Sequence, residues 1–328
     1  MLTLSLDFGG TKLAAGLVDA NTGQVFAAEQ HPTPDDATSS YAAMLDMAKT
    51  LLGHAPGQVH AVGVSFGGPV EADGRTVRCS MHINGWEDAA LAAWIERDIS
   101  LPCAIANDAD AAALAEQRYG AGRDVMHLLY LTVSTGIGGG IVIGGKLYRG
   151  ARAWAGEVGH QVLDPRGPPC ACGRNGCLES LASGRGVARA AKIALGALRS
   201  NLDMLQADEV PPEQHNSSLL SLPVEQITAQ TVAEAAAIGD VLASIVWERA
   251  MTWLGIGIAN AANVLNPALV VLGGGLTRAG ALLFEPVRHI VAQRVLDPNL
   301  EIVPAALGDH IGLLGGAAIA ADMPHMSE

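Results

Sequence analysis

Three cysteines lie close together in the segment CACGRNGC, at Cys170, Cys172 and Cys177, and His160 precedes them. A cluster of this kind can be a redox pair, a disulfide, a chance gathering of buried thiols or a metal site. Cys-x-Cys spacing differs from the Cys-x-x-Cys spacing of thiol redox enzymes. Three thiolates and one imidazole suit the tetrahedral coordination of Zn²⁺, and four protein ligands leave no open position. The four residues therefore predict a structural zinc site.

Acidic and amide side chains follow two of the predicted strands. Asp7 lies at the glycine turn that ends an apolar strand over 2–10, and Asn107 and Asp108 lie where a strand meets an Ala-rich helix within 101–120. A carboxylate at such a junction can accept a proton as a general base. Asn and Asp are also preferred as the first caps of helices. The residues alone leave both roles open.

Three glycine-rich turns follow apolar strands, in DFGGTK (7–12), STGIGGG (134–140) and LGGG (272–275). Such turns let backbone N–H groups approach phosphate oxygens closely. No Gly-x-x-x-x-Gly-Lys-Ser/Thr motif occurs, which excludes a P-loop. GIGGGI (136–141) lacks the third glycine of a dinucleotide fingerprint and runs into a strand. The turns favour a polyphosphate gripped by two hairpins, with Asp7 holding Mg²⁺ directly or through water.

Side chains in these turns could add to a phosphate site. Thr11 and Thr135 carry hydroxyl groups that can donate hydrogen bonds. Lys12 would place a positive charge near the phosphates, or would be an ordinary solvated residue of a strand. One such turn would be poor support for nucleotide binding, whereas three turns in one chain favour it.

The pattern of strand, glycine turn and strand in 2–23 recurs in 127–150. Either two unrelated hairpins look alike, or the chain holds a duplicated α/β domain with a cleft between its halves. Further elements are also expected. They are a helix over 41–55, a strand over 60–70, mainly helical chain over 185–262 with a polar interruption around 207–223, a strand and helix over 269–280, and a Gly/Ala-rich helix over 309–322.

Composition restricts the class of protein. The 328 residues are 49% hydrophobic and 16% charged, which indicates a globular chain. The formal net charge of −13 argues against a nucleic-acid partner, because phosphates would be repelled. The apolar segment 251–275 is interrupted by three Asn and one Pro, so we expect a buried helix and strand rather than a membrane span. With no export signal, we expect a cytosolic protein whose thiols stay reduced.

Six segments occur in the order found in a known family: LDFGGTKLAAGLVD, GVSFGGPV, ANDADAAALAE, LTVSTGIGGGIVIGGKLYRG, AGEVGH and PPCACGRNGCLESLASG. From about residue 2 to residue 320 the chain resembles the ROK family of sugar kinases and related repressors. The resemblance implies a two-domain α/β fold of the actin/hexokinase type, with ATP in an interdomain cleft. It implies a small domain over 1–118, on which a helix at about 309–328 packs back, and a larger domain over 119–308 with the zinc site.

The resemblance also implies roles for single residues. Asp108 matches the family's catalytic base, and Glu157 and Glu179 match positions that hydrogen-bond sugar hydroxyls. His160 would bind zinc through one ring nitrogen and present the other to the sugar. The implied sugar ligands are Gly68, Asn84, Asn107, Asp108, Glu157, His160 and Glu179. The implied nucleotide ligands are Asp7, Gly9, Gly10, Thr11, Lys12, Thr135, Gly136, Gly138, Gly273, Gly274 and Gly275.

One segment departs from the family pattern. Many relatives place an Asn four residues before the tryptophan at 86, whereas this chain has His82 there and Asn84 two residues before it. Either residue could reach the substrate. The departure therefore affects the identity of the sugar more than the type of reaction.

We expect an ATP-dependent hexose kinase that converts glucose to glucose 6-phosphate, with ATP, Mg²⁺ and a structural Zn²⁺. The alternatives are an N-acetylmannosamine, mannose or fructose kinase of the same family, which the zinc segment does not separate, and a noncatalytic sugar-sensing regulator. The family's repressors carry a helix-turn-helix region before the first glycine turn, and here only six residues precede that turn's Asp7. The resemblance implies a homodimer or a tetramer, and no nucleic-acid or membrane partner is expected.

Overall fold

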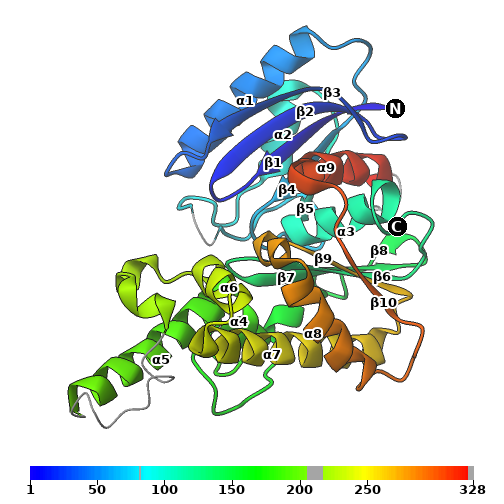
Figure 1. Cartoon of the computed structure of the whole chain (residues 1–328). Helices are drawn as coiled ribbons and strands as arrows, with labels where there is room; N and C mark the ends of the chain where they lie inside the picture. The colour runs from blue at the N-terminus through cyan, green and yellow to red at the C-terminus, as the bar shows by residue number, and fades with distance from the viewer. Residues whose placement is uncertain (81–82, 205–216, 324–328) are drawn as a thin grey trace. The chain divides into compact units, whose positions relative to one another are not determined.

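The structure, a computed structural model, describes residues 1–80, 83–204 and 217–323 (Figure 1). His82 and the residues 207–216 of the expected polar interruption lie outside the described residues.

The chain divides into two compact units according to its internal contacts. The first unit consists of Met1–Tyr130, Gly139–Gly156 and Ala305–Glu328. The second unit consists of Leu131–Gly138 and Glu157–Pro304. The domains expected over 1–118 and 119–308 stay a prediction.

The first unit is built on a five-stranded sheet with the strand order β3-β2-β1-β4-β5. Its strands are β1 (Leu2–Phe8), β2 (Lys12–Asp19), β3 (Gln24–Pro32), β4 (Val62–Phe66) and β5 (Cys103–Asn107). β1 pairs antiparallel with β2 and parallel with β4, which in turn pairs parallel with β5. The carboxyl ends of β1, β4 and β5 therefore meet at one edge, where the register sets Asp7 beside Ser65 and Phe66 beside Asn107.

Helices cover both faces of this sheet (Figure 1). On one face lie α1 (Ala37–Gly53), which contacts β1, β2 and β3, and α2 (Leu91–Ile99), which contacts β5. On the other lie α3 (Asp108–Tyr119) and α9 (Ile311–Asp322), which contact each other. A 3₁₀ turn, η6 (Gly308–His310), leads into α9. The α1 and α9 helices correspond to two helices expected from the sequence.

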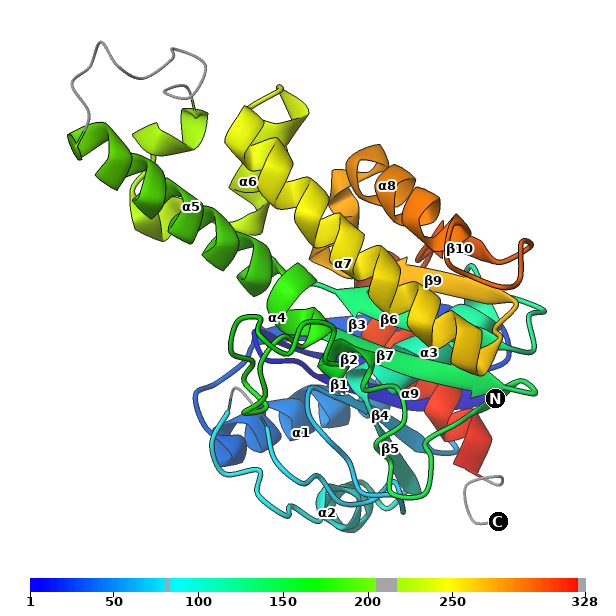
Figure 2. The same cartoon turned by 90° about the horizontal axis from the view of Figure 1, so that it is seen from below.

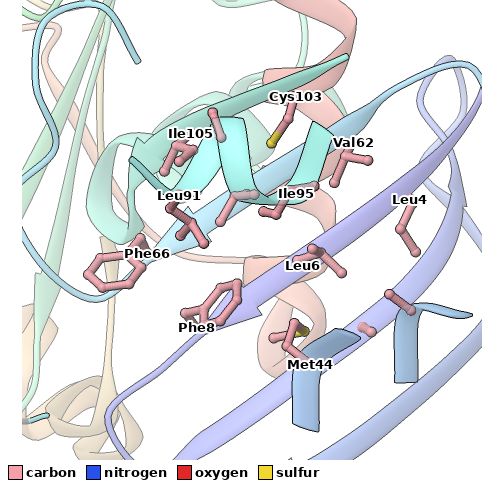
Figure 3. Packing of buried hydrophobic residues seen from close by; sticks show 14 of the residues in the cluster. Leu4, Leu6, Phe8, Met44, Val62, Phe66, Leu91, Ile95, Cys103 and Ile105 are labelled. Carbon is pink, nitrogen blue, oxygen red and sulfur yellow. The ribbon is translucent and has the colours of Figure 1, made fainter. Parts of the chain in front are cut away.

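The hydrophobic core of the first unit fills the face under α1 and α2 (Figure 3). Leu4, Leu6 and Phe8 of β1 belong to one buried cluster with Met44 of α1 and Leu91 of α2. Successive side chains of a strand point to opposite faces. The residues between these three in β1 therefore face α3 and α9, which is where polar side chains are found.

Helix α9 packs against the sheet with almost no side-chain layer between them. A side chain at Gly63 would overlap the backbone of Gly316, and one at Gly316 would overlap the Ser5 hydroxyl and the Gly63 backbone. Ser5 Oγ also donates a hydrogen bond to the Leu313 carbonyl. Glycine is therefore required at this contact for steric reasons, and the contact brings the helix backbone close to β1 and β4.

The second sheet has the order β10-β9-β6-β7-β8. Its strands are β6 (Leu128–Val133), β7 (Ile137–Ile143), β8 (Lys146–Leu147), β9 (Leu269–Gly273) and β10 (Glu301–Pro304). Read from β8, this order repeats that of the first sheet strand for strand. β7–β8 is antiparallel like β2–β3, and β9–β10 is parallel like β4–β5. The matching topology supports the duplication, and it makes the β6–β7 turn the counterpart of the β1–β2 turn.

The second unit holds the remaining helices. They are α4 (Leu178–Ala182), α5 (Gly184–Met204), α6 (Ala229–Ala237), α7 (Val241–Leu265) and α8 (Ala281–Ala292), with 3₁₀ turns η1 (Val158–His160), η3 (Ser218–Ser221), η4 (Val224–Gln226) and η5 (Gly275–Ala279). α7 contacts α4, α5, α6 and α8 (Figure 2). Asp240 caps its start by accepting a 2.9 Å hydrogen bond from Ala243 N.

α7 is the one described helix that is long and apolar enough to cross a membrane by length and composition alone. Half of its most apolar stretch is buried inside the protein. The buried core helix of a protein can have the same length and apolar composition. α7 is followed by β9, so the apolar segment 251–275 forms the helix and strand expected from the sequence.

The packing of α9 predicts a difference between two Gly→Ala variants. Gly316→Ala should lower the free energy of unfolding by about 1–3 kcal/mol, because the added methyl group overpacks a contact with no room. Gly196→Ala is the matched control on α5, where a Cβ would meet nothing within 4 Å. It should leave stability unchanged or raise it by up to about 1 kcal/mol through helix propensity. Urea unfolding measures both, and equal stability of Gly316→Ala and the unmodified protein would contradict the packing argument.

Candidate functional site

Asp7 is a half-buried carboxylate at the carboxyl end of β1. Its Oδ1 accepts a 2.8 Å hydrogen bond from Ser65 Oγ. A Cβ at Gly312 of α9 would overlap the Asp7 carboxyl group, so this group lies against the helix backbone. Burial raises the pKa of Asp7 to about 6, and the charge of Asp108 adds to the rise, whereas the Ser65 hydrogen bond and Lys12 lower it. A cation bound here would favour the ionised form.

Asn107 and Asp108 lie at the junction of β5 and α3, as the sequence predicts. Asn107 is the N-cap of α3, since its Oδ1 accepts a 2.9 Å hydrogen bond from Ala109 N. Its Nδ2 donates a 3.0 Å bond to the Gly68 carbonyl. Asp108 is exposed, and its Oδ1 accepts a 2.8 Å bond from Ala109 N. The capping role is thus filled by Asn107, and the Asp108 carboxylate is held at the surface in the first turn of the helix.

The turn between β1 and β2 is held by a hydrogen bond within the turn and by two hydrogen bonds from Thr33, the residue that follows β3. Gly9 N donates to the Lys12 carbonyl at 3.1 Å. Thr33 donates through its backbone N to Thr11 O at 3.1 Å and through its Oγ1 to Gly9 O at 2.7 Å. Within the described part of the chain, the N–H groups of Gly10 and Thr11 donate no hydrogen bond. Two consecutive N–H groups of this kind can bind an anion.

The other two predicted ligands of the first unit are Gly68 and Asn84. Gly68 is buried, and a side chain there would overlap the Cys79 carbonyl. Asn84 is exposed, and its carbonyl accepts a 3.0 Å hydrogen bond from Ala37 N. Among the described residues, Asn84 has no hydrogen bond to another predicted site residue. The structure therefore joins Gly68 to Asn107 by a hydrogen bond.

In the second unit, the three clustered cysteines and His160 come together. The ligand atoms of His160, Cys170, Cys172 and Cys177 all lie within 4.8 Å of one another. Cys170 Sγ is 3.6 Å from His160 Nδ1, and Cys172 Sγ is 3.6 Å from Cys177 Sγ. A tight loop holds the cysteines, with Cys170 N donating to Arg174 O at 2.8 Å.

These distances fit a tetrahedral metal ion. Zn–S bonds of about 2.3 Å and Zn–N bonds of about 2.0–2.1 Å place neighbouring tetrahedral ligands roughly 3.5–3.8 Å apart. Both measured pairs, at 3.6 Å, lie in this range. The donor set of three sulfurs and one nitrogen is the kind that holds structural zinc. The residues present therefore fit the metal that the sequence predicts.

Glu157 and Glu179 flank the cysteine cluster. Glu157 Oε2 lies 3.6 Å from His160 Nε2, the ring nitrogen that faces away from Cys170. Desolvation raises the pKa of Glu157, His160 lowers it, and the charge of Glu179 raises it. Glu179 Oε1 is 3.9 Å from Cys170 Sγ. The two carboxylates and one imidazole nitrogen thus form a group of hydrogen-bonding atoms suited to a polyol.

Glu179 also binds the turn between β6 and β7. Its Oε2 accepts a 3.0 Å hydrogen bond from Ile137 N. Ser134 N donates to Gly136 O at 2.9 Å and closes the turn. Thr135, at its tip, is exposed. One carboxylate therefore connects the cysteine loop to the second glycine turn.

The glycines after β9 lie next to the same turn. Gly273 is the last residue of β9 and is buried. Gly274 has a φ of +88°, and a side chain there would overlap the backbone of Val133. A Cβ at Gly275 would lie 3.5 Å from Ser134 Oγ. Gly274 and Gly275 therefore lie beside the carboxyl end of β6, and Gly138 is half-buried within β7.

Two polar residues near these groups were absent from the predicted ligands. Ser65 could have been found, because it lies in GVSFGG and its register partner in the parallel pair β1–β4 is Asp7. Arg185 gave no signal in the sequence. Its Nε donates a 3.3 Å hydrogen bond to the Thr135 carbonyl, a contact between residues 50 positions apart.

Known proteins resemble the chain over nearly its whole length. A glucokinase of Streptomyces coelicolor is 33% identical over 326 residues, which cover 97% of either chain. An N-acetylmannosamine kinase of Escherichia coli (strain SMS-3-5 / SECEC) is 34% identical over 322 residues, which cover 98% of either chain. The crystal structure of a ROK family glucokinase from Streptomyces griseus in complex with glucose and AMPPNP has a TM-score of 0.78 and 33% identity, and the match covers 98% of this chain and 100% of that one.

These likenesses confirm the α/β fold of the actin/hexokinase type that the sequence predicts. The family model described as the ROK family matches residues 3–323, which include both sheets, the glycine turns and the cysteine cluster. The chain therefore belongs to the ROK family.

Proposed function

We propose that this protein is an ATP-dependent hexose kinase that transfers a phosphoryl group to the 6-hydroxyl of glucose. The observation that carries the proposal is the pairing of Asp7 and Asp108 at the carboxyl ends of β1 and β5. The parallel strands β1, β4 and β5 end at the same edge of the first sheet, the charge of Asp108 contributes to the raised pKa of Asp7, and a glycine turn follows Asp7. The glucokinase relatives, and the Streptomyces griseus structure with glucose and AMPPNP, support it.

Phosphoryl transfer to a hydroxyl requires positioning, neutralisation of charge and an acceptor for the hydroxyl proton. Asp108 would take that proton. Its carboxylate is exposed and is fixed by the Ala109 N–H, and the first turn of a helix favours a negative charge. Asn107, rather than Asp108, is the N-cap residue of this helix.

Asp7 would hold Mg²⁺, which neutralises phosphate charge when bound. Ser65 fixes one carboxylate oxygen, and the α9 backbone limits the space around the group. The N–H groups of Gly10 and Thr11 would bind phosphate oxygens in the first turn, with Lys12 nearby. In the second unit, the turn at Thr135–Gly136 and the glycines 273–275 would receive the rest of the nucleotide.

The sugar would be bound by oxygen and nitrogen atoms of its predicted ligands. Glu157, Glu179 and the Nε2 atom of His160 would accept or donate hydrogen bonds to its hydroxyl groups. In the first unit Asn107, Asn84 and the Gly68 backbone would contribute. Each carboxylate can accept several hydrogen bonds, which suits a ligand rich in hydroxyl groups.

A structural Zn²⁺ would fix the orientation of these sugar ligands. His160 would bind the metal through Nδ1, which faces Cys170, and would keep Nε2 towards Glu157. Glu179 follows the last cysteine ligand by two residues at the start of α4. Metal binding would therefore order two groups that hydrogen-bond the sugar without taking part in the chemistry.

A second candidate substrate is N-acetylmannosamine. The Escherichia coli N-acetylmannosamine kinase is 34% identical to this chain, which is as similar as the glucokinases. The expected homodimer or tetramer and the cytosolic location also stay proposals.

A coupled assay of ADP release tests the function. We expect glucose to give the highest kcat/KM in a panel with mannose, fructose, glucosamine and N-acetylmannosamine. Asp108→Asn should fold normally and lose about 10²- to 10⁴-fold in kcat, because the base is removed. Asp46→Asn on the exposed side of α1 is the matched control and should retain full activity.

The assay distinguishes three failures. No sugar-stimulated ADP release with any hexose would reject the kinase. A higher kcat/KM for N-acetylmannosamine would reject glucose as the substrate and keep the reaction. Normal turnover by Asp108→Asn would remove this residue from the mechanism.

Zinc analysis of the purified protein tests the metal centre. We expect about one zinc ion per chain, and Cys172→Ser should lose most of it and weaken sugar binding about 10- to 100-fold, because the sugar ligands lose their support. Glu179→Gln should keep the zinc and still weaken sugar binding. Cys79→Ser, which changes a cysteine outside the cluster, is the control for zinc content. Unchanged sugar affinity after zinc removal would contradict the proposal that zinc supports the sugar ligands.

The raised pKa of Asp7 predicts how stability depends on pH in the metal-free protein. Since its pKa lies above the unfolded value of 3.8, the native state favours the protonated form. The contribution of protonated Asp7 to the free energy of unfolding is therefore complete below pH 3.8, and it is lost as the pH rises through about 6. Asp7→Asn, which does not ionise, should therefore gain about 2–3 kcal/mol over the unmodified protein between pH 4 and pH 8.

Urea unfolding in EDTA across that pH range measures the difference between Asp7→Asn and the unmodified protein. A difference in the free energy of unfolding that stays constant with pH would show that Asp7 ionises as readily in the folded chain as in the unfolded one.

A further inference from the structure

The turn between β6 and β7 presents two consecutive backbone donors. Ser134 N is occupied by the Gly136 carbonyl and Ile137 N by the Glu179 carboxylate. Between them, the N–H groups of Thr135 and Gly136 donate to no other group in the part of the chain that the structure describes. Successive N–H groups in a turn form a concave site for an anion.

Arg185 is held against this turn at the start of α5. Its backbone N and its Nε both donate to the Thr135 carbonyl, at 3.4 Å and 3.3 Å. The preceding residue, Gly184, donates its N–H to the Ser134 carbonyl at 2.7 Å. These bonds fix the guanidinium group at the turn. Its two terminal nitrogens have no hydrogen bond among the described residues, and the side chain is exposed.

The duplication explains why the second turn needs a cation from elsewhere. The first turn is followed by Lys12, which lies at the start of β2. In the second sheet the corresponding strand, β7, begins at Ile137. The second turn therefore carries no positive side chain of its own, and Arg185 is positioned to supply one.

We propose that Arg185 is a ligand for the polyphosphate of the nucleotide, acting together with the N–H groups of Thr135 and Gly136. The inference rests on the proposed kinase function, and it names a residue outside the predicted nucleotide ligands. The guanidinium fork can donate two parallel hydrogen bonds to phosphate oxygens, which a single ammonium group cannot do. The carbonyl of Thr135 already accepts hydrogen bonds from Arg185, and the N–H groups of Thr135 and Gly136 remain for the phosphate.

Isothermal titration of the full chain with ATP, ADP and adenosine in the presence of Mg²⁺ tests this role. Arg185→Met should weaken ATP and ADP binding about 10- to 100-fold, because charge-assisted hydrogen bonds are lost. Adenosine, which has no phosphate, should bind within about twofold of the unmodified protein. Arg185→Lys restores the charge and should recover part of the affinity. Arg249→Met, at an exposed site on α7 of the same unit, is the control.

Steady-state kinetics give a second readout. Arg185→Met should raise KM for ATP and leave KM for the sugar unchanged. Binding of ATP by Arg185→Met as tightly as by the unmodified protein would overturn the role of Arg185 and leave the kinase intact. An equal loss of adenosine binding would also overturn it, since the defect would then lie in the fold of the site. Failure of the unmodified protein to bind ATP would reject the proposed function and this role with it.

Discussion

The close contact between the backbone of α9 and the strands β1 and β4 is the constraint on which the first unit depends. Gly63 and Gly316 allow the helix to approach without a layer of side chains. At the same helix, Gly312 lies against the carboxyl group of Asp7. The helix therefore excludes water from a carboxylate that Ser65 orients, and burial raises its pKa. A larger residue at any of these glycines would move the helix away from the group that it confines.

The second unit uses a carboxylate in a different way. Glu179 accepts a hydrogen bond from the backbone of the second glycine turn through one oxygen, and its other oxygen lies near Cys170 Sγ. The turn proposed for the phosphate and the loop proposed for zinc are therefore mechanically connected through one side chain. Effects of substitutions in the two loops should be nonadditive, as is usual for residues that share a partner.

Local patterns predicted much of the site. The cysteine cluster was found from spacing alone, because its ligands lie within 18 residues from His160 to Cys177. The strands around the glycine turns and the helices over 41–55 and 309–322 were predicted because glycine turns and apolar periodicity are local signals, whereas α2 and β10 were not predicted. The resemblance to a family supplied the actin/hexokinase-type fold and the roles of Glu157 and Glu179. The positions of Asn107 and Asp108 were correct, but only the structure separated the cap from the exposed carboxylate.

The remaining features depend on contacts between distant residues. Gly312 meets Asp7 and Arg185 meets Thr135 through tertiary packing, and neither pair has a local pattern that reports it. The availability of N–H groups in the two turns depends on which carbonyl and carboxylate groups lie nearby. Sequence can predict a glycine turn, but it cannot predict which of its donors are already occupied.

The place of α9 in the chain has a consequence for biosynthesis. The helix that covers Asp7 follows the whole of the second unit in sequence, whereas β1 is among the first residues to be made. During synthesis the second unit can be completed while the first still exposes the underside of β1 and β4. The first unit must then wait, partly folded, for its last helix. A nascent chain that stalls before α9 would leave uncovered the apolar residues of β2 and β5 that pack with this helix, such as Val18 and Ala106, and would be prone to aggregation or chaperone binding.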